Sequence, residues 1–132
     1  GAVLHTHSQA GTLLSQWALQ QASSDGHSPA TAAALELSGL EMLKGLEGIS
    51  THATAVQLPV LANDQNLARL SQQAAPLLSG APQGLLIGGH GLYAWGRDLS
   101  SAERHLEILE FLLEQRWRQL LLQALSQGMR GS

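Results

Sequence analysis

The chain has 132 residues, of which 7 are basic and 10 acidic, so its net charge is −3 with histidine counted as neutral. This length suits a single domain, and the lack of excess basic residues disfavours nucleic-acid binding. The chain contains six histidines and no cysteine, which excludes disulfides, thiolate metal sites and a cysteine nucleophile. A metal ion would therefore need histidine or carboxylate ligands.

A hydrophobic content of 44% with 13% charged residues is typical of a globular domain. The longest apolar runs, such as Leu120-Leu121-Leu122, are far shorter than a membrane span. No secretory signal pattern is present, so we expect a cytoplasmic location and no membrane partner. Because the chain begins with Gly1 inside an apolar run and not with methionine, we expect that it lacks its natural N-terminus.

The first third of the chain predicts a strand, a helix and a loop. Ala2-Val3-Leu4 predicts a buried strand that continues into His5-Thr6-His7. A polar loop is expected over 23–29, and its His27 is expected to be solvated. Between them lies a predicted helix with Ser8 as its cap, because apolar side chains recur there at helical spacing: Ala10, Leu13, Leu14, Trp17 and Ala18.

The middle of the chain predicts a helix, a strand and another helix. The first helix spans 35–46 and ends near Gly45 and Gly48. Alternation over 55–60 predicts the strand, in which Pro59 favours an edge position or a strand end. Asn63 and Asp64 are the expected caps of the next helix, whose length is limited by Pro76 and whose apolar face carries Leu67, Leu70, Ala74 and Leu77.

Residues 84–87 and 92–95 predict two strands around the turn Gly88-Gly89-His90-Gly91. A capping box over 100–103 is expected to begin a long terminal helix with apolar residues along one face: Leu106, Leu109, Leu113, Trp117 and Leu120. Strands that alternate with helices predict an α/β domain in which helices pack on one sheet.

His5 and His7 lie two apart in the predicted strand, so both imidazoles point to one face and Thr6 to the other. Their Cα atoms would be roughly 6 to 7 Å apart, which lets two nitrogens reach one metal ion at about 2.0 to 2.1 Å. The spacing predicts a chelating pair. The alternative is one core histidine and one solvated histidine, because so short a motif also occurs by chance.

A catalytic zinc site usually has three protein ligands and one open position. His90 is the best candidate for the third ligand, because it lies in a glycine-rich turn from which a side chain can project beyond the sheet. An ordinary turn histidine is the alternative. His52 and His105 have no neighbouring histidine in the sequence, and surface or structural roles are expected for both.

Acid/base chemistry also needs a proton acceptor. Glu41 lies inside the apolar pattern Leu40-Glu41-Met42-Leu43, where partial desolvation would raise the pKa of its carboxyl group into a useful range. Glu36 and Glu47 are the competing carboxylates, because charged residues of an amphipathic helix usually face water. The residues alone leave the choice among these three carboxylates open, with Glu41 as one candidate catalytic residue.

Four segments follow one another in the chain, namely residues 3–8, 40–45, 58–60 with 63–65, and 89–96, and the first, second and fourth carry these candidates. Together they resemble the methylthioribulose-1-phosphate dehydratases, a branch of the class II aldolase and adducin superfamily. The His-x-His motif is shared across the superfamily. The segments Asn63-Asp64-Gln65 and Gly89-His90-Gly91-Leu92-Tyr93-Ala94-Trp95-Gly96 are more specific to the dehydratase branch.

The resemblance implies one Zn²⁺ per subunit held by His5, His7 and His90, with Glu41 as the catalytic acid/base. It implies a three-layer α/β/α fold with a mainly antiparallel central sheet, of which residues 1–132 form the C-terminal two-thirds of a single domain. The implied assembly is a homotetramer with active sites between subunits. The implied activity is a lyase step of methionine salvage that removes water from a phosphorylated sugar, 5-methylthioribulose 1-phosphate, to give 2,3-diketo-5-methylthiopentyl 1-phosphate.

Two other functions fit the same residues. A class II sugar-phosphate aldolase would share the metal site and cleave a carbon–carbon bond. A non-catalytic, adducin-like assembly module would keep the fold without the metal, which the three retained histidines disfavour.

Overall fold

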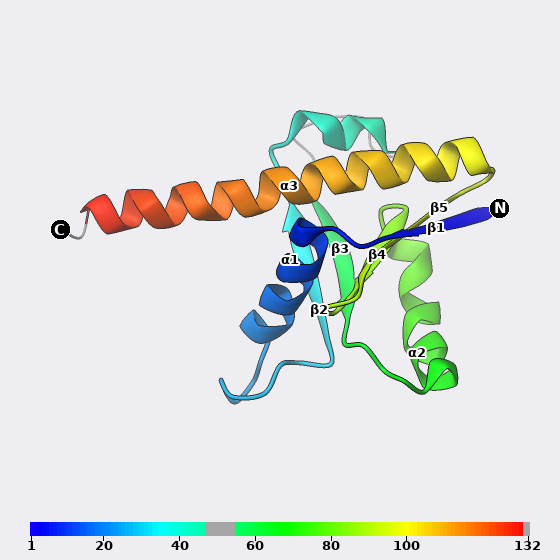
Figure 1. Cartoon of the computed structure of the whole chain (residues 1–132), viewed down its shortest axis with the longest axis horizontal. Helices are drawn as coiled ribbons and strands as arrows, with labels where there is room; N and C mark the ends of the chain where they lie inside the picture. The colour runs from blue at the N-terminus through cyan, green and yellow to red at the C-terminus, as the bar shows by residue number, and fades with distance from the viewer. Residues whose placement is uncertain (47–54, 131–132) are drawn as a thin grey trace.

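The computed structural model describes residues 1–46 and 55–130. Within these residues, one five-stranded sheet has the strand order β1-β5-β4-β3-β2, and helices cover both of its faces (Figure 1). The strands are β1 (Ala2–Thr6), β2 (Ala32–Leu37), β3 (Val56–Leu61), β4 (Gly84–Ile87) and β5 (Gly91–Gly96). The helices are α1 (Gln9–Gln21), α2 (Leu67–Ala74) and α3 (Leu99–Arg130), with the 3₁₀ helices η1 (Glu41–Gly45) and η2 (Ala75–Gly80).

The sheet is mixed, so the expectation of a mainly antiparallel sheet is wrong. β3 and β4 run parallel, whereas the pairs β1–β5, β2–β3 and β4–β5 are antiparallel. The cause is the connection between β3 and β4, which crosses over through α2 and η2. Such a helical crossover returns the chain in the same direction, which a short hairpin cannot do.

The apolar side chains of the sheet separate into two clusters, one on each face. The larger cluster packs under α1 and α3, and the smaller one, formed by Leu61, Leu85 and Ile87, contacts Leu70 and Ala74 of α2. The predicted α/β class is therefore confirmed, with a helical layer on each face. The fully buried leucines of the larger cluster include Leu35, Leu37, Leu58, Leu86, Leu92, Leu109, Leu112 and Leu113.

The predicted helices at residues 9–21 and in the C-terminal region are confirmed. Ser8 caps α1, since its Oγ accepts the N–H of Gly11 at 2.9 Å. α3 begins at Leu99, and the carboxylate of Asp98 accepts the N–H of Ser101 at 2.8 Å. The cap of α3 is thus Asp98, one residue before the helix, and not the predicted box that begins at Ser100.

The predicted helix over 35–46 is wrong, because this stretch forms β2 and η1. Leu35 and Leu37 are buried and Glu36 between them is exposed, which is the period of a strand. Gly39 then adopts a φ of +67°, a left-handed conformation that ends the strand and that glycine adopts without steric cost.

The strand at 56–61 is confirmed, although Pro59 does not place it at an edge. β3 lies between β2 and β4. Pro59 pairs with Ala34 of β2, while the pairing with β4 begins one residue later, at Val60. The missing N–H of proline therefore falls before the β4 ladder, where it costs no hydrogen bond to that strand.

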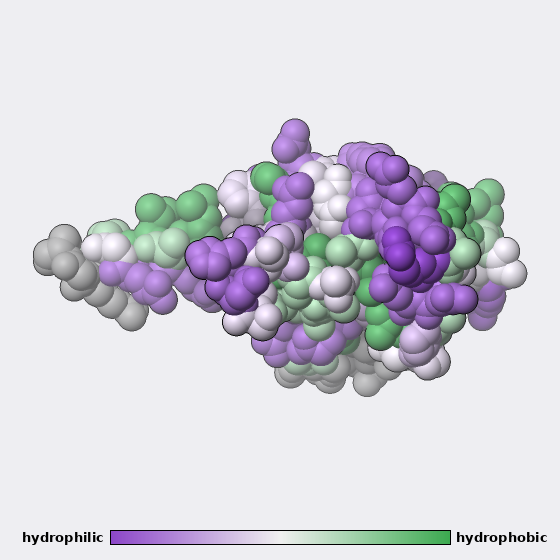
Figure 2. Space-filling model, turned by 90° about the horizontal axis from the view of Figure 1, so that it is seen from below, coloured by the Kyte–Doolittle hydropathy of each residue, from purple (hydrophilic) through white to green (hydrophobic). Residues whose placement is uncertain are grey.

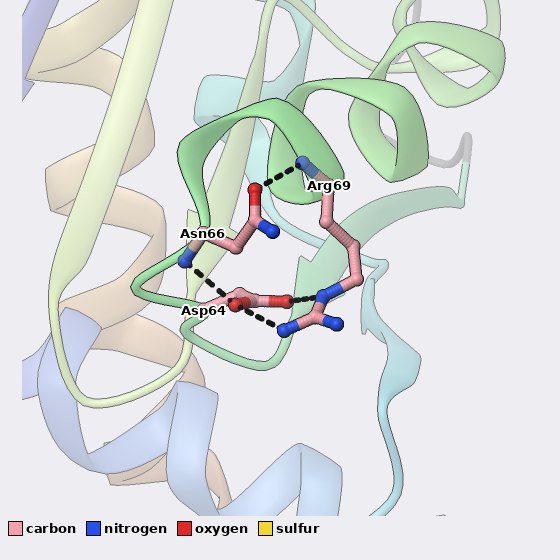
Figure 3. Close-up of polar contacts among 3 residues, drawn as sticks. All are labelled: Asp64, Asn66 and Arg69. Atoms are coloured by element: carbon pink, nitrogen blue, oxygen red, sulfur yellow. Dashed lines mark hydrogen bonds and ion pairs between the residues drawn. The ribbon is translucent and has the colours of Figure 1, made fainter.

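The helix after β3 begins later than predicted. Asn66, and not Asn63 or Asp64, caps α2, because its Oδ1 accepts the N–H of Arg69 at 3.1 Å. Asp64 instead holds the loop before the helix: its carboxylate accepts the N–H of Asn66 and pairs with the guanidinium of Arg69 (Figure 3). These contacts lower the pKa of Asp64.

Two surfaces are more exposed than the sequence predicts. β1 is an edge strand of the described sheet, and the side chain of Val3 is 66% exposed, so the strand is not buried. The C-terminal part of α3 projects from the body (Figures 1 and 2) and exposes Leu121, Leu122, Leu125 and Met129. Among the described residues, no helix combines the length and apolar character needed to cross a bilayer.

The turn before β5 depends on a glycine, which gives a first prediction. Gly91 has a φ of +139°, and a Cβ atom there would overlap the carbonyl oxygen of Thr6 in β1. We expect Gly91→Ala to lower the free energy of unfolding by more than about 2 kcal/mol. Gly26→Ala is the control, because Gly26 also has positive φ but open space around it, so only the backbone cost of about 1 kcal/mol applies. Urea unfolding followed by circular dichroism measures both, and equal losses would contradict the prediction.

Candidate metal centre

Antiparallel pairing of β1 with β5 brings the three predicted histidines together. In the register His5 lies opposite Tyr93 and Thr6 opposite Leu92, which places the end of β1 beside the turn that carries His90. The ring centroids of His5 and His7 are 4.6 Å apart, and the ring of His90 lies 4.9 Å from His5 and 4.8 Å from His7. One nitrogen of each ring lies within 4.8 Å of the others.

The two sides of β1 serve different purposes. His5 and His7 lie on one face, as strand alternation predicts. Thr6 points the other way, and its Oγ1 donates a hydrogen bond to Oε1 of Glu110 on α3 at 2.8 Å. Attachment of Thr6 to α3 therefore holds the strand in the orientation that presents both imidazoles on the opposite face.

The hydrogen bond of His5 defines which of its nitrogens is available. Nδ1 of His5 lies 2.9 Å from the carbonyl oxygen of Leu92. A carbonyl oxygen only accepts, so Nδ1 must carry the proton. The lone pair of a neutral His5 is then on Nε2, which is the arrangement of a metal-binding histidine whose other nitrogen donates to a carbonyl group.

His90 stays neutral over a wider pH range than an isolated histidine. Desolvation of its ring lowers its pKa, and the neighbouring His5 and His7 lower it further by electrostatic repulsion. A neutral imidazole is the form that binds a metal ion. Because the proton is disfavoured in the fold, His90 contributes stability that is lost as the pH falls through its lowered pKa.

The donor set fits a transition-metal ion such as zinc. The group contains three imidazoles and, within the part of the chain that the structure describes, no carboxylate. Nitrogens that bind one zinc ion at about 2.0 to 2.1 Å are at most about 4.2 Å apart, so small side-chain rotations would suffice. None of the three rings is buried, which leaves a fourth position accessible from outside.

A cavity of about 600 Å³ adjoins the cluster at His90. It lies between α2 and the sheet face that also carries Tyr93. Its lining includes the polar residues Asn63, Asp64, Gln65 and Ser71 but is mainly apolar, with Val3, Leu67, Leu70, Leu78, Leu85, Ile87 and Trp95. A ligand of mixed character could therefore lie beside the histidines.

Glu41 does not lie in this cluster. It sits on η1, its side chain is 59% exposed, and its carboxylate pairs with the ammonium group of Lys44. Figure 1 shows η1 on the other side of α3 from β1 and β5. The expectation that Glu41 is desolvated is therefore wrong, because its apolar neighbours Leu40 and Leu43 turn into the core while Glu41 turns to solvent.

The remaining predicted residues have separate positions. His27 is exposed in its loop, as expected. His105 is fully buried and its Nδ1 lies 2.8 Å from the carbonyl oxygen of Trp95, which confirms a structural role. Glu36 is exposed on β2. His52 and Glu47 lie outside the described residues.

Sequence reasoning missed Tyr93 and the carbonyl group of Leu92. The ring of Tyr93 stacks on His5 with centroids 4.2 Å apart. Both residues belong to β5 and reach His5 only through the β1–β5 register. The position of Tyr93 three residues after His90 was a local signal, but its contact with His5 depends on pairing that no local pattern defines.

Comparison with known proteins agrees with this architecture. Residues 1–117 match the model of the Class II Aldolase and Adducin N-terminal domain. The chain belongs to the class II aldolase and adducin family. The match covers all of the elements from β1 to β5 and the first part of α3, including the three clustered histidines.

Several relatives within this family are named methylthioribulose-1-phosphate dehydratase. The relative from Sorangium cellulosum is 43% identical over 86% of this chain and 50% of its own length. The relative from Gluconobacter oxydans is 48% identical over 86% of this chain and 49% of its own length. The relative from Serratia proteamaculans is 44% identical over 94% of this chain and 56% of its own length. The chain thus spans about half the length of the relatives it matches.

The lowered pKa of His90 gives a second prediction. In the metal-free protein, the His90 ring should titrate below the ordinary histidine value of about 6.5. His7→Ala should raise this midpoint, because it removes one of the neighbouring imidazoles that repel the charged ring. NMR titration of the ring protons measures both values. A midpoint that stays unchanged in His7→Ala would contradict the electrostatic part of the explanation.

Proposed function

We propose that this chain carries the metal centre of a zinc-dependent hydro-lyase that dehydrates 5-methylthioribulose 1-phosphate, a step of methionine salvage. The observation that carries the proposal is the convergence of His5, His7 and His90 in a chain of this family. The names of its relatives support the choice of substrate. The product would be 2,3-diketo-5-methylthiopentyl 1-phosphate and water.

In this proposal His5, His7 and His90 hold the ion through neutral imidazole nitrogens. A bound Zn²⁺ would supply Lewis-acid polarisation of the carbonyl and hydroxyl oxygens at C2 and C3, which makes the C3 proton more acidic. The hydrogen bond from Nδ1 of His5 to Leu92 keeps Nε2 directed to the ion. The stacked ring of Tyr93 restricts rotation of the His5 ring.

Glu41 is the proposed acid/base. Its carboxylate would remove the proton from C3 and then return it to the hydroxyl that leaves C4 as water, so one group serves both steps. Its assignment rests on the resemblance of the segment 40–45 to the dehydratase branch. η1 lies in the helical layer of α3, away from the sheet face that carries the three histidines. An experiment must therefore decide whether the base of one site comes from the same copy of the chain as its metal ion or from a neighbouring copy.

The cavity beside His90 favours the dehydratase over the sugar-phosphate aldolase. Both candidate substrates are sugar phosphates, so their hydroxyl and phosphate groups do not distinguish them, but only the dehydratase substrate also carries an apolar group, and the walls of this cavity are mainly apolar. A methylthio group is apolar and suits such walls. The amides of Asn63 and Gln65 in the lining could orient the polar part of the same substrate.

The proposal also includes the homotetramer and the cytoplasmic location. The family resemblance implies active sites between subunits. In such an assembly, a neighbouring subunit would bury the exposed apolar side chains of α1 and α3. Light scattering after size-exclusion chromatography measures the mass of the assembly directly.

The third prediction concerns the metal ligands. His5→Ala and His90→Ala should each reduce bound zinc from about one ion per chain to a small fraction, because two imidazoles bind far more weakly than three. His27→Ala is the matched control, since His27 is exposed in a loop away from the cluster. Elemental analysis after dialysis measures the metal. Full zinc content in His90→Ala would exclude the proposed centre.

The fourth prediction concerns Glu41. Glu41→Gln should retain zinc but lose about 10²- to 10⁴-fold in kcat, the usual contribution of a general acid/base. Glu36→Gln is the control, because Glu36 is an exposed carboxylate on β2 and should leave kcat unchanged. Product formation from 5-methylthioribulose 1-phosphate measures the rate, and full activity of Glu41→Gln would exclude the assignment.

Mixing the two kinds of variant locates the base. Neither Glu41→Gln nor His90→Ala should be active alone. If the base and the metal of one site come from different copies, mixed assemblies of the two variants recover part of the activity. If both come from one copy, mixing recovers none.

A further inference from the structure

We propose that Ser15 of α1 is a positioning residue that holds the His90 turn in register with His5 and His7. This inference rests on the metal centre of the proposed function. Ser15 lies on a helix outside the histidine group, and the sequence marks it only as a polar position within an amphipathic pattern. Its side chain nevertheless reaches the glycine next to His90.

The hydroxyl group of Ser15 both donates and accepts a hydrogen bond. Ser15 is 0% exposed. Its Oγ donates to the carbonyl oxygen of Thr12 at 2.8 Å and accepts the N–H of Gly89 at 3.0 Å. The roles cannot be exchanged, because a carbonyl oxygen only accepts and a backbone N–H only donates. Thr12 therefore orients the hydroxyl so that its lone pair points at the turn.

The turn is held by three consecutive N–H groups. Gly88 donates to the carbonyl oxygen of Leu61 at 2.7 Å, and His90 donates to that of Ile87 at 2.9 Å. Gly89, between them, donates to Ser15. Of these three acceptors, only that of Ser15 belongs to a side chain. This hydrogen bond therefore depends on the residue type at position 15, whereas the two hydrogen bonds to backbone carbonyl groups do not depend on residue type.

The contact acts at the glycine that directly precedes His90. Gly89 has a φ of +67°, in a region that glycine enters and leaves with little cost. An acceptor fixed on a helix restricts this freedom, and it does so at the residue adjacent to His90. Without the hydroxyl, the N–H of Gly89 loses its partner, and the direction of the His90 ring is set by the backbone of a flexible glycine pair.

The same helix also links the turn to the other two histidines. α1 begins two residues after His7, and its cap at Ser8 fixes the direction in which the chain leaves β1. Ser15 lies on the buried side of this helix. One rigid element thus carries both the end of the His-x-His segment and the acceptor for the His90 turn, which fixes the distance between them.

Cobalt binding tests the inference without catalysis. Ser15→Ala should weaken binding of Co²⁺ by about 10- to 100-fold, the usual effect of losing an outer-shell contact of a metal site, and should change the visible absorption of the bound ion. Ser15→Thr, which keeps the hydroxyl, should bind Co²⁺ within a few-fold of the wild type. Asp98→Ala is the control for stability, because it removes a helix cap at the far end of β5 and should leave the affinity and the spectrum unchanged.

A measurement on the wild type keeps the test independent of how Ser15→Ala folds. The Gly89 amide should exchange with solvent slowly, in contrast to an exposed turn amide, because its proton is held by a buried hydroxyl. Rapid exchange of this amide would overturn the inference. So would unchanged Co²⁺ affinity and spectrum in Ser15→Ala, or a Ser15→Thr variant as weak as Ser15→Ala.

The result also separates this inference from the proposed function. If wild type binds Co²⁺ and His90→Ala does not, the metal centre stands, and the Ser15 variants then decide the positioning role alone. If wild type and His90→Ala bind Co²⁺ equally weakly, the metal centre fails and the positioning role fails with it.

Discussion

The pairing of β1 with β5 is the constraint on which the site depends. It joins residues that are 87 apart in the sequence, because the hydrogen bond from His5 to Leu92 crosses from one strand to the other. In an antiparallel pair the register is strict, since a slip of one residue would turn His5 and His7 to the opposite face. Thr6 resists such a slip, because it would then lose Glu110 as a partner. The positions of the His5 and His7 rings thus follow from this pairing, whereas His90 lies in the turn that Ser15 contacts.

The elements that the sequence predicts well are those whose signal is local. α1 and the N-terminal half of α3 bury one face, so the helical period of apolar residues is sufficient to identify them. The hairpin β4–β5 is marked by its glycines, and the face shared by His5 and His7 follows from strand alternation alone. The contact of His5 and His7 with His90 is predicted only from the need of a zinc site for a third ligand. In the structure, the pairing of the distant strands β1 and β5 brings the three rings together.

The wrong predictions of helices, strands and caps arise where a local sequence pattern fits two structures, or where burial depends on packing against residues distant in the sequence. Leu35, Leu37, Leu40 and Leu43 satisfy a helical reading, yet Leu35 and Leu37 form a strand because β3 offers them a partner. Pro59 favours an edge position, but β3 is central: β2 pairs along all of it, and β4 pairs only with Val60 and Leu61, after the proline. The sequence offers other polar residues close to the caps Asn66 and Asp98. Which of them caps the helix depends on where the backbone turns into the helix, and the sequence does not define that residue.

Glu41 shows why metal binding and proton transfer place different demands on one chain. The three histidines need fixed mutual distances, and a sheet supplies them through strand register and a hydrogen-bonded turn. A group that moves protons needs access to solvent and substrate, and the carboxylate on η1, which is the base of our proposal, is exposed to solvent. η1 packs through Leu43 and Gly45 against the α3 layer, whereas the cavity beside His90 opens on the α2 face. The two requirements are thus met on opposite faces of the sheet, so the proposed chemistry requires that assembly of copies, or movement of η1, brings them into one site.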